Sequence, residues 1–320
     1  MGKTFVFNGD ADGLCALQQL HLDEGVDGAT LITGPKRRTA LVREASAAAD
    51  DEVTVLDLSF DVNREAVDAL LCAGARVRYF DHHHAASVPT HPALEAHIDP
   101  SPTTCTSAII DRYLDGRERA WAIVGAFGDN FSETANRLAS TLALNSETCT
   151  QLERLGLLLN YNSYGEREED LFFPPAELHR RLSGYRDPLA FVREEPAYRT
   201  LSAGHDEDMQ RVQELRAIAC SNHAAVYVLP DASWARRVSG VLANRLARTS
   251  PASAHAVLSP NSTGGMQVSV RAPLERPTGA AAFCLAYSTG GGREAAAGIN
   301  HLPIDEVAAF AERFLHHFAA

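Results

Sequence analysis

The chain of 320 residues is longer than one ordinary domain, and its 45% hydrophobic content is typical of a globular protein. Its net charge of −12 is uneven: residues 223–320 carry eight Arg, no Lys and six acidic residues, a balance of +2, which leaves −14 for residues 1–222. Long nucleic acids require a basic binding surface, so this acidic body predicts no long nucleic-acid partner.

Other sequence features bear on the compartment. No apolar run approaches the length that crosses a membrane, and the chain enters a predicted strand at once, so we expect no membrane partner and no signal peptide. The six cysteines form no Cys-x-x-Cys pair, which favours reduced thiols and a cytoplasmic location. A monomer and a homodimer are both compatible with this composition.

The first part of the chain alternates short apolar runs with helix-like stretches. The runs at residues 4–7, 53–56 and 77–80 are typical of buried strands. We expect the helices between and after them at residues 13–22, 38–49 and 64–73. This order predicts βαβ units, and therefore an α/β fold with a parallel sheet.

Residues 104–162 are predicted to be mostly helical, because their apolar residues recur at three- and four-residue spacing. Residues 160–205 are expected to be irregular, because four prolines would break any long helix. We therefore predict a first domain over residues 1–195 and a linker over residues 196–222.

The remaining residues, 223–320, predict a second, smaller α/β domain. It begins with an apolar strand at residues 225–229, and a helix follows. Residues 265–271 alternate strictly, which places Met266, Val268 and Val270 on one face of a strand. A run of three glycines precedes an Ala-rich stretch that we expect to be a helix. The run is either a simple turn or a set of backbone N–H groups that bind an anion.

Acidic residues follow each of the three predicted strands of the first domain. They are Asp10 and Asp12 in Asn8-Gly9-Asp10-Ala11-Asp12-Gly13, Asp57, and Asp81 in Asp81-His82-His83-His84. The carboxyl ends of parallel strands meet at one edge of a sheet, so these side chains should converge there. Oxygen ligands with one or two imidazoles favour Mn²⁺ or Mg²⁺ over zinc or copper. Taken singly, an Asx-Gly turn, a helix cap and a polar loop would explain the same residues.

These motifs resemble those of the DHH phosphoesterases, in the branch that carries a C-terminal DHHA1 domain. Residues 8–13 resemble the first motif of that family, Asp57 the second, Asp81-His82-His83 the third, and Gly128-Asp129-Asn130 the fourth. Ser269-Val270-Arg271 and residues 290–298 resemble the DHHA1 signatures. The resemblance covers nearly the whole chain and extends to stand-alone bacterial cyclic-dinucleotide phosphodiesterases and nanoRNases.

The resemblance implies a site with two Mn²⁺ ions, with Mg²⁺ or Co²⁺ as alternatives. Asp10 would bind the first ion, and Asp57 would bridge the two ions, which activate a water molecule for attack on phosphorus. The second ion would be bound by the remaining ligands, Asp12, His82 and Asp129. His83 would contact the scissile phosphate and assist the leaving group, or would instead support His82.

The resemblance also implies a set of substrate contacts. These are His83, His84, Arg271, Gly290, Gly291, Gly292 and Arg293, with the site expected in the cleft between the two domains. Many family members carry His at the positions of Asn8 and Arg293. The guanidinium of Arg293 suits binding of a phosphate or a purine edge. A surface salt bridge would equally explain Arg271. The roles of Asn8, Asp81, Asn130 and Ser269 stay open.

The function implied by the resemblance is metal-dependent hydrolysis of a cyclic dinucleotide, such as cyclic GMP-AMP, c-di-AMP or c-di-GMP, to linear dinucleotides or mononucleotides. A nanoRNase or phosphoadenosine-phosphate phosphatase is the first alternative, and a single-strand exonuclease is the second. A non-catalytic nucleotide sensor is a third alternative, which the complete set of aspartates disfavours.

Overall fold

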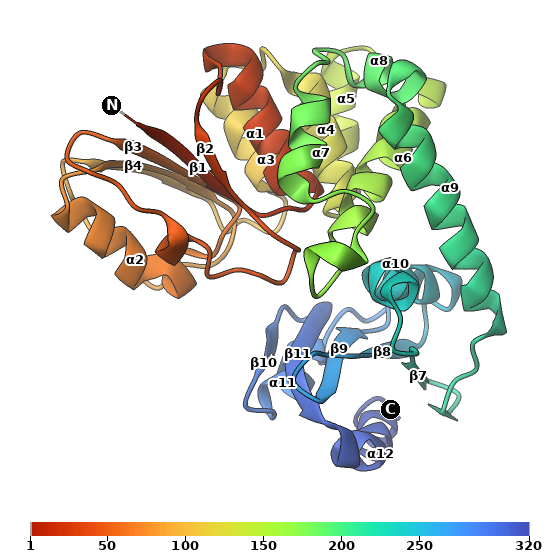
Figure 1. Cartoon of the computed structure of the whole chain (residues 1–320). Coiled ribbons are helices and arrows are strands. Elements are labelled where there is room, and N and C mark those ends of the chain that lie inside the picture. Colours follow the sequence, from red (N-terminus) through yellow and green to blue (C-terminus); the bar gives the residue numbers. More distant parts are fainter. Residues whose placement is uncertain (1, 320) are drawn as a thin grey trace. The chain divides into compact units, whose positions relative to one another are not determined.

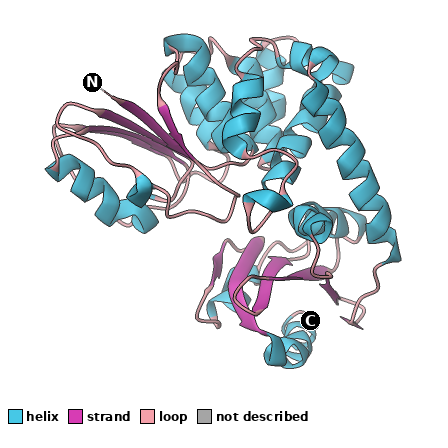
Figure 2. Cartoon of the chain, viewed as in Figure 1, coloured by secondary structure: helices cyan, strands magenta, loops and turns pink. Residues whose placement is uncertain are grey.

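The computed structural model describes residues 2–319, and the chain divides into two compact units, Met1–Ala203 and Gly204–Ala320 (Figure 1). Each unit contains one sheet with helices packed against it (Figure 2). None of the described helices combines the length and the apolar character needed to cross a membrane.

The first unit is built on a five-stranded sheet in the order β2-β1-β3-β4-β5, and every neighbouring pair is parallel. The strands are β1 (Lys3–Phe7), β2 (Thr30–Ile32), β3 (Glu52–Leu56), β4 (Arg76–Asp81) and β5 (Leu94–Ile98). The α/β fold with a parallel sheet, which the alternating pattern predicts, is confirmed. All five strands end at the same edge, which is where the predicted acidic residues follow.

Helices cover both faces of this sheet (Figure 1). On one face, Val53 and Val55 pack with Val67 and Leu70 of α2 (Phe60–Cys72). On the other face, Phe5 and Phe7 belong to a larger core formed with the remaining helices of the unit. These include α1 (Ala11–Glu24), α3 (Thr106–Tyr113), α4 (Arg119–Gly128), α5 (Ser132–Thr141) and α6 (Ser146–Ser163). Because both faces are buried, the strands are apolar runs without strict alternation.

Three predictions of secondary structure differ from the structure, and the first concerns residues 38–49. Residues 38–49 form only a 3₁₀ turn, η1 (Val42–Glu44). The side chain of Asn63 on α2 explains the difference, because it accepts a bond from the Val42 N–H at 3.2 Å and donates to the Thr39 carbonyl at 2.8 Å. This side chain therefore bonds backbone groups of the segment that a helix would otherwise pair with each other.

Residues 160–205 are more helical than predicted. They contain α7 (Pro175–Leu182), α8 (Pro188–Glu194) and the start of α9 (Pro196–Arg211). The prolines do interrupt a long helix, but Pro175, Pro188 and Pro196 each begin a new helix, where the missing N–H costs nothing, and Pro174 is the N-cap of α7. The segment expected as a linker, residues 196–222, holds α9, a 3₁₀ turn (Val212–Glu214) and β6 (Ala219–Cys220).

The second unit has a six-stranded sheet in the order β10-β11-β9-β8-β7-β6, in which only β7 and β8 run parallel. Its further strands are β7 (Ala224–Val228), β8 (Ala254–Pro260), β9 (Gly265–Arg271), β10 (Gly290–Gly292) and β11 (Ala296–Pro303). Its helices are α10 (Ser233–Thr249), α11 (Ala280–Leu285) and α12 (Val307–His317). Met266, Val268 and Val270 are buried together, as the alternation of β9 predicts.

The helix expected after the glycine run is absent from this part of the described chain, where the Ala-rich residues form strand β11 instead. Gly290–Gly292 is itself strand β10, which pairs antiparallel with β11. Close packing requires glycine at position 290, and the backbone conformation favours it at position 292. A Cβ at Gly290 would lie 1.7 Å from the Cys284 carbonyl oxygen, and Gly292 has a φ of +137°, which side chains rarely adopt.

Candidate metal centre

The first motif lies between strand β1 and helix α1, where Asp10 is the N-cap. Its Oδ1 accepts bonds from the backbone N–H groups of Asp12 (3.0 Å) and Gly13 (3.1 Å). The glycine is required by packing, because a Cβ at Gly13 would lie 2.1 Å from the Asn8 carbonyl oxygen. The turn and cap that explain these residues singly are thus present, and they hold the Asp10 carboxylate in one orientation.

Asp12 is fully buried in the first turn of α1. Its two carboxylate oxygens accept bonds from the backbone N–H groups of Thr106 and Ser107, both at 2.7 Å, at the start of α3. Burial raises the pKa of Asp12, and His82 opposes this effect while Asp129 and Asp10 add to it. A nearby cation would relieve the cost of this buried charge.

Asp57 directly follows β3 with a φ of +58°, the left-handed region that non-glycine residues seldom occupy. Its backbone N–H donates to the Phe80 carbonyl at 3.0 Å, which keeps the turn in register with β4. Its Oδ1 accepts a bond from the Thr106 hydroxyl at 3.1 Å. Burial, followed by the charges of Asp10 and Asp12, raises the pKa of Asp57 well above its usual range.

His82 lies between two of these carboxylates. Its Nε2 is 3.4 Å from Asp57 Oδ1 and 3.7 Å from Oδ2 of Asp129, which follows α4. The Nδ1 of His82 is 3.1 Å from the Thr104 carbonyl oxygen. A carbonyl can only accept, so Nδ1 carries a proton, and Nε2 is the ring nitrogen that faces the carboxylates. Metal-binding histidines are oriented by this kind of outer contact.

The other two histidines of the run differ in their surroundings. His83 Nδ1 is 2.6 Å from Oδ1 of the fully buried Asp81. Burial alone would lower the pKa of His83, but the bond to Asp81 and the charges of Asp81 and Asp57 raise it above its ordinary value. His84 is 81% exposed and lies 3.9 Å from Asp61.

Two groups of side chains bring potential ligand atoms within 4.8 Å of one another. One group is Asp12, His82 and Asp129, and the other is Asp57, His82 and His83. The first group matches the ligands expected for one ion, and His82 links it to Asp57. Four carboxylates from strand and helix ends therefore surround one region of the first unit. They come from three distant parts of the chain and are those of Asp10, Asp12, Asp57 and Asp129.

Sequence reasoning missed two residues at this cluster. Lys36 places its ammonium against Asp10 and 3.0 Å from Asp129 Oδ1, and Asn160 Oδ1 is 3.3 Å away from the same ammonium. Burial disfavours the charged form of Lys36, but Asp10 and Asp129 outweigh this and raise its pKa well above its ordinary value. Lys36 follows β2 by four residues, so the rule that singles out residues after parallel strands could have found it. Asn160 lies within α6 and gives no such signal.

The remaining predicted residues have their own contacts. Asn8 is buried, and its Nδ2 donates to the Lys36 carbonyl at 3.4 Å. Asn130 has a φ of +64° immediately after Asp129. In the second unit, the Arg271 Nε donates to Asn244 Oδ1 at 2.8 Å, and the Arg293 N–H donates to the Ala296 carbonyl at 2.8 Å. Ser269 is buried in β9 and faces Gly298 of β11.

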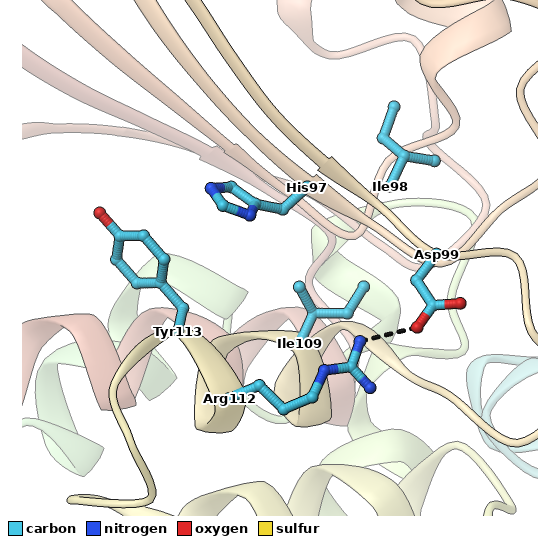
Figure 3. A pocket seen from close by; sticks show the side chains of 6 residues that line it. All are labelled: His97, Ile98, Asp99, Ile109, Arg112 and Tyr113. Carbon is cyan, nitrogen blue, oxygen red and sulfur yellow. Dashed lines mark hydrogen bonds and ion pairs between the residues drawn. The ribbon is translucent and has the colours of Figure 1, made fainter.

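A separate pocket of about 360 Å³ lies beside β5 and α3 (Figure 3). Its lining residues are His97, Ile98, Asp99, Ile109, Arg112 and Tyr113. Asp99 accepts a bond from Arg112 at 2.7 Å, and His97 stacks on Phe80 with ring centroids 4.8 Å apart. Neither potential ligand group contributes to its walls, so the acidic cluster is the stronger candidate for chemistry.

Comparison with solved structures finds RecJ proteins over the whole chain. RecJ from Thermus thermophilus in complex with Mn²⁺ gives a TM-score of 0.67 at 18% identity, with 99% of this chain and 52% of that chain covered. An exonuclease RecJ bound to manganese gives a TM-score of 0.60 at 17% identity, with 99% of this chain and 90% of that chain covered. The Thermus thermophilus RecJ in complex with Mg²⁺ gives a TM-score of 0.59 at 16% identity, with 99% of this chain and 49% of that chain covered.

At 16–18% identity these likenesses establish the fold alone, which matches that of RecJ. The chain spans about half the length of the Thermus thermophilus RecJ structures. No protein-family model matches the chain, and no curated protein is similar enough in sequence to count as a relative.

Proposed function

We propose that this protein is a divalent-metal-dependent phosphodiesterase. The observation that carries the proposal is the arrangement of the buried Asp12 and Asp57 and the half-buried Asp129 around the Nε2 of His82. Carboxylate oxygens with one imidazole form a ligand set that suits Mn²⁺ or Mg²⁺. The likeness to RecJ structures that contain these ions supports the same choice.

The residues present fit one such ion well. Each of Asp12, Asp57 and His82 is held by an outer contact that fixes its orientation, from the start of α3, the Thr106 hydroxyl and the Thr104 carbonyl respectively. Burial, and after it the neighbouring carboxylates, raise the pKa values of Asp12 and Asp57, an effect that an additional cation would oppose. When bound, a divalent ion supplies this charge and activates water for attack on phosphorus.

His83 is placed to act on the leaving group. Its pairing with the buried Asp81 fixes the Nδ1 proton, so its other ring nitrogen is left for the substrate. The side chain is 45% exposed, whereas that of His82 is 7% exposed, so a phosphate can reach His83 more readily. We assign His82 to the metal and His83 to the scissile phosphate and the departing 3′ oxygen.

The substrate class that we favour is a cyclic dinucleotide, which is opened to the linear form and then to mononucleotides. The acidic balance of residues 1–222 disfavours a long binding track for a polyanion, and the eight arginines of residues 223–320 suit short phosphates. We assign nucleotide binding to Arg271, Arg293 and the Gly290–Gly292 strand of the second unit. Linear dinucleotides and phosphoadenosine phosphate are the nearest alternative substrates.

A single-strand exonuclease is the second candidate function. It is favoured by the likeness to an exonuclease RecJ over 99% of this chain and 90% of that one. The two candidates differ in the length of the substrate that they prefer. A processive exonuclease needs a path for many phosphates, whereas a dinucleotide enzyme needs only two.

The deciding experiment separates these functions by product analysis. The metal-free protein is incubated with Mn²⁺ or Mg²⁺ and with cyclic dinucleotides, linear dinucleotides, short RNA and a long single strand. We expect cleavage of dinucleotides to exceed that of the long strand by at least tenfold, and chelation to abolish it. Processive digestion of the long strand would favour the exonuclease, and binding of nucleotides without cleavage would favour a sensor.

A variant of the second unit tests its assigned role. Arg293→Ala should raise the KM for a dinucleotide by roughly 10-fold, because it removes one charge-assisted contact. The KM for a nitrophenyl phosphodiester, which is too small to use that contact, should stay unchanged, as should the metal content. Arg276→Ala, in the same unit, is the matched control. An equal loss on both substrates would mean that Arg293 has only a structural role.

A further inference from the structure

The ammonium of Lys36 lies within the acidic cluster and has three oxygen partners there. It contacts Asp10 Oδ2, lies 3.0 Å from Asp129 Oδ1 and lies 3.3 Å from Asn160 Oδ1. These partners come from the start of α1, the end of α4 and the last third of α6. The arrangement resembles the oxygen shell that a metal ion would otherwise gather.

The loop that carries Lys36 is itself fixed in place. The Lys36 N–H donates to the Ser163 carbonyl at 3.0 Å, and the Lys36 carbonyl accepts from the Asn8 side chain at 3.4 Å. The ammonium also lies 5.7 Å from the centre of the Tyr164 ring. The side chain is 22% exposed, so most of it is withdrawn from water. The position of the positive charge is therefore built into the first unit.

The carboxylates divide between two sides of the cluster. Asp10 bonds backbone N–H groups with one oxygen and Lys36 with the other. Asp129 directs Oδ1 to Lys36 and Oδ2 towards His82. On the far side, Asp12 and Asp57 have His82 beside them and no lysine or arginine among the contacts that the described residues show.

We propose that the ammonium of Lys36 takes the place of one of the two divalent ions expected from the family resemblance, so that the centre binds a single ion. This inference rests on the proposed function and concerns the same site. The ion is held by Asp12, Asp57, His82 and Asp129, and Asp10 serves to position Lys36 rather than to bind metal.

Charge balance supports this arrangement. One divalent ion and Lys36 bring three positive charges to four carboxylates, whereas two ions and Lys36 would bring five. A second ion at Asp10 would also have to share its oxygen with a fixed ammonium, and like charges at such short range repel strongly where water is scarce.

The test is a count of bound Mn²⁺ on the full chain, made without reference to activity. The metal-free protein is saturated with Mn²⁺, freed of excess ion by gel filtration and analysed for metal, and its electron paramagnetic resonance spectrum is recorded. We expect one ion and an uncoupled spectrum for the wild type. Lys36→Met keeps the length of the side chain without its charge, and it should bind two ions with an exchange-coupled spectrum.

Two further variants serve as controls. Arg38→Met removes a charge from the same loop, where Arg38 bonds Glu44 at the surface, and it should bind one ion. Asp10→Asn should also bind one ion, whereas it would lose an ion from a two-ion centre.

Two ions in the wild type would overturn the inference while leaving the metal-dependent function intact. A single ion in a folded Lys36→Met protein would also overturn it. If Lys36→Met does not fold, the wild-type count still decides, because a two-ion centre would bind two Mn²⁺ in the wild type and one in Asp10→Asn. No uptake of Mn²⁺ by any of these proteins would overturn both the inference and the proposed function.

Discussion

Ionisable groups lie at both ends of helix α1, and their surroundings differ. At the first turn, Asp10 and Asp12 lie among Lys36, His82 and backbone N–H groups. At the last turn, His21 packs edge-on against His179 of α7, with ring centroids 5.7 Å apart. The ammonium of Lys36 faces the acidic end, whereas no carboxylate contacts the His21–His179 pair among the described residues.

The pKa of His179 follows from these surroundings. Burial, with a smaller contribution from His21, lowers the pKa of His179 from 6.5 to about 3, so the imidazole stays neutral in the folded protein. Its Nε2 is buried and has no hydrogen-bond partner among the described residues. An ionisable group that is buried without a counter-charge becomes neutral, and one that is buried with a counter-charge can serve chemistry. Three substitutions test this comparison.

The largest effect is expected at the acidic end. Asp57→Asn should lower turnover by more than about 100-fold, because loss of a direct ligand should exceed the 10- to 100-fold loss typical of an outer contact. The measurement is the rate of dinucleotide hydrolysis at saturating Mn²⁺. Asp68→Asn, on the exposed side of α2, is the control and should retain full activity. Near-normal turnover by Asp57→Asn would remove the acidic cluster from the catalytic mechanism.

The next effect concerns the histidine end and is a dependence of stability on pH. The unfolded state binds the proton of His179 near pH 6.5 and the folded state only near 3, so stability is fully present above pH 6.5 and falls as the pH decreases towards 3. Between pH 7.5 and 5 this group should cost about 2 kcal/mol of unfolding free energy. Urea unfolding at the two pH values measures the loss.

His179→Phe should remove that contribution, because phenylalanine cannot be protonated. His223→Asn, at an exposed position, should leave the pH dependence as it is in the wild type. An equally steep loss of stability in His179→Phe would show that other groups cause it, and the contrast between the two ends of α1 would then fail.

The smallest effect concerns the outer hydrogen bond that orients Asp57 at the acidic end. Thr106→Val removes the hydroxyl that bonds Asp57 Oδ1 at 3.1 Å while it keeps the shape of the side chain. The affinity for Mn²⁺ should fall by roughly 10-fold, the lower end for loss of an outer contact. Thr106→Ser retains the hydroxyl and should restore most of the affinity, as measured by calorimetric titration. No difference between the two variants would mean that Asp57 is oriented by its backbone alone.

Much of the first unit could be predicted from local pattern. Apolar runs followed by helices indicate a parallel sheet, and the acidic residues after β1, β3 and β4 follow from where those runs end. The prediction was weaker where a side chain replaces local bonding, as Asn63 does for residues 38–49. It also failed for the Ala-rich residues after the glycine run, because pairing with β9 and β10 outweighs helix propensity.

Local pattern is enough to predict the fold class and the acidic residues and histidines that follow strand ends. Asp129 follows helix α4 and was predicted from its family motif instead. The balance of charge in the cluster depends on the tertiary structure. Lys36 lies 26, 93 and 124 residues from Asp10, Asp129 and Asn160 along the chain, and no local pattern relates them. Their meeting depends on how β2, α4 and α6 pack around α1, so the positive charge within the cluster is a product of packing.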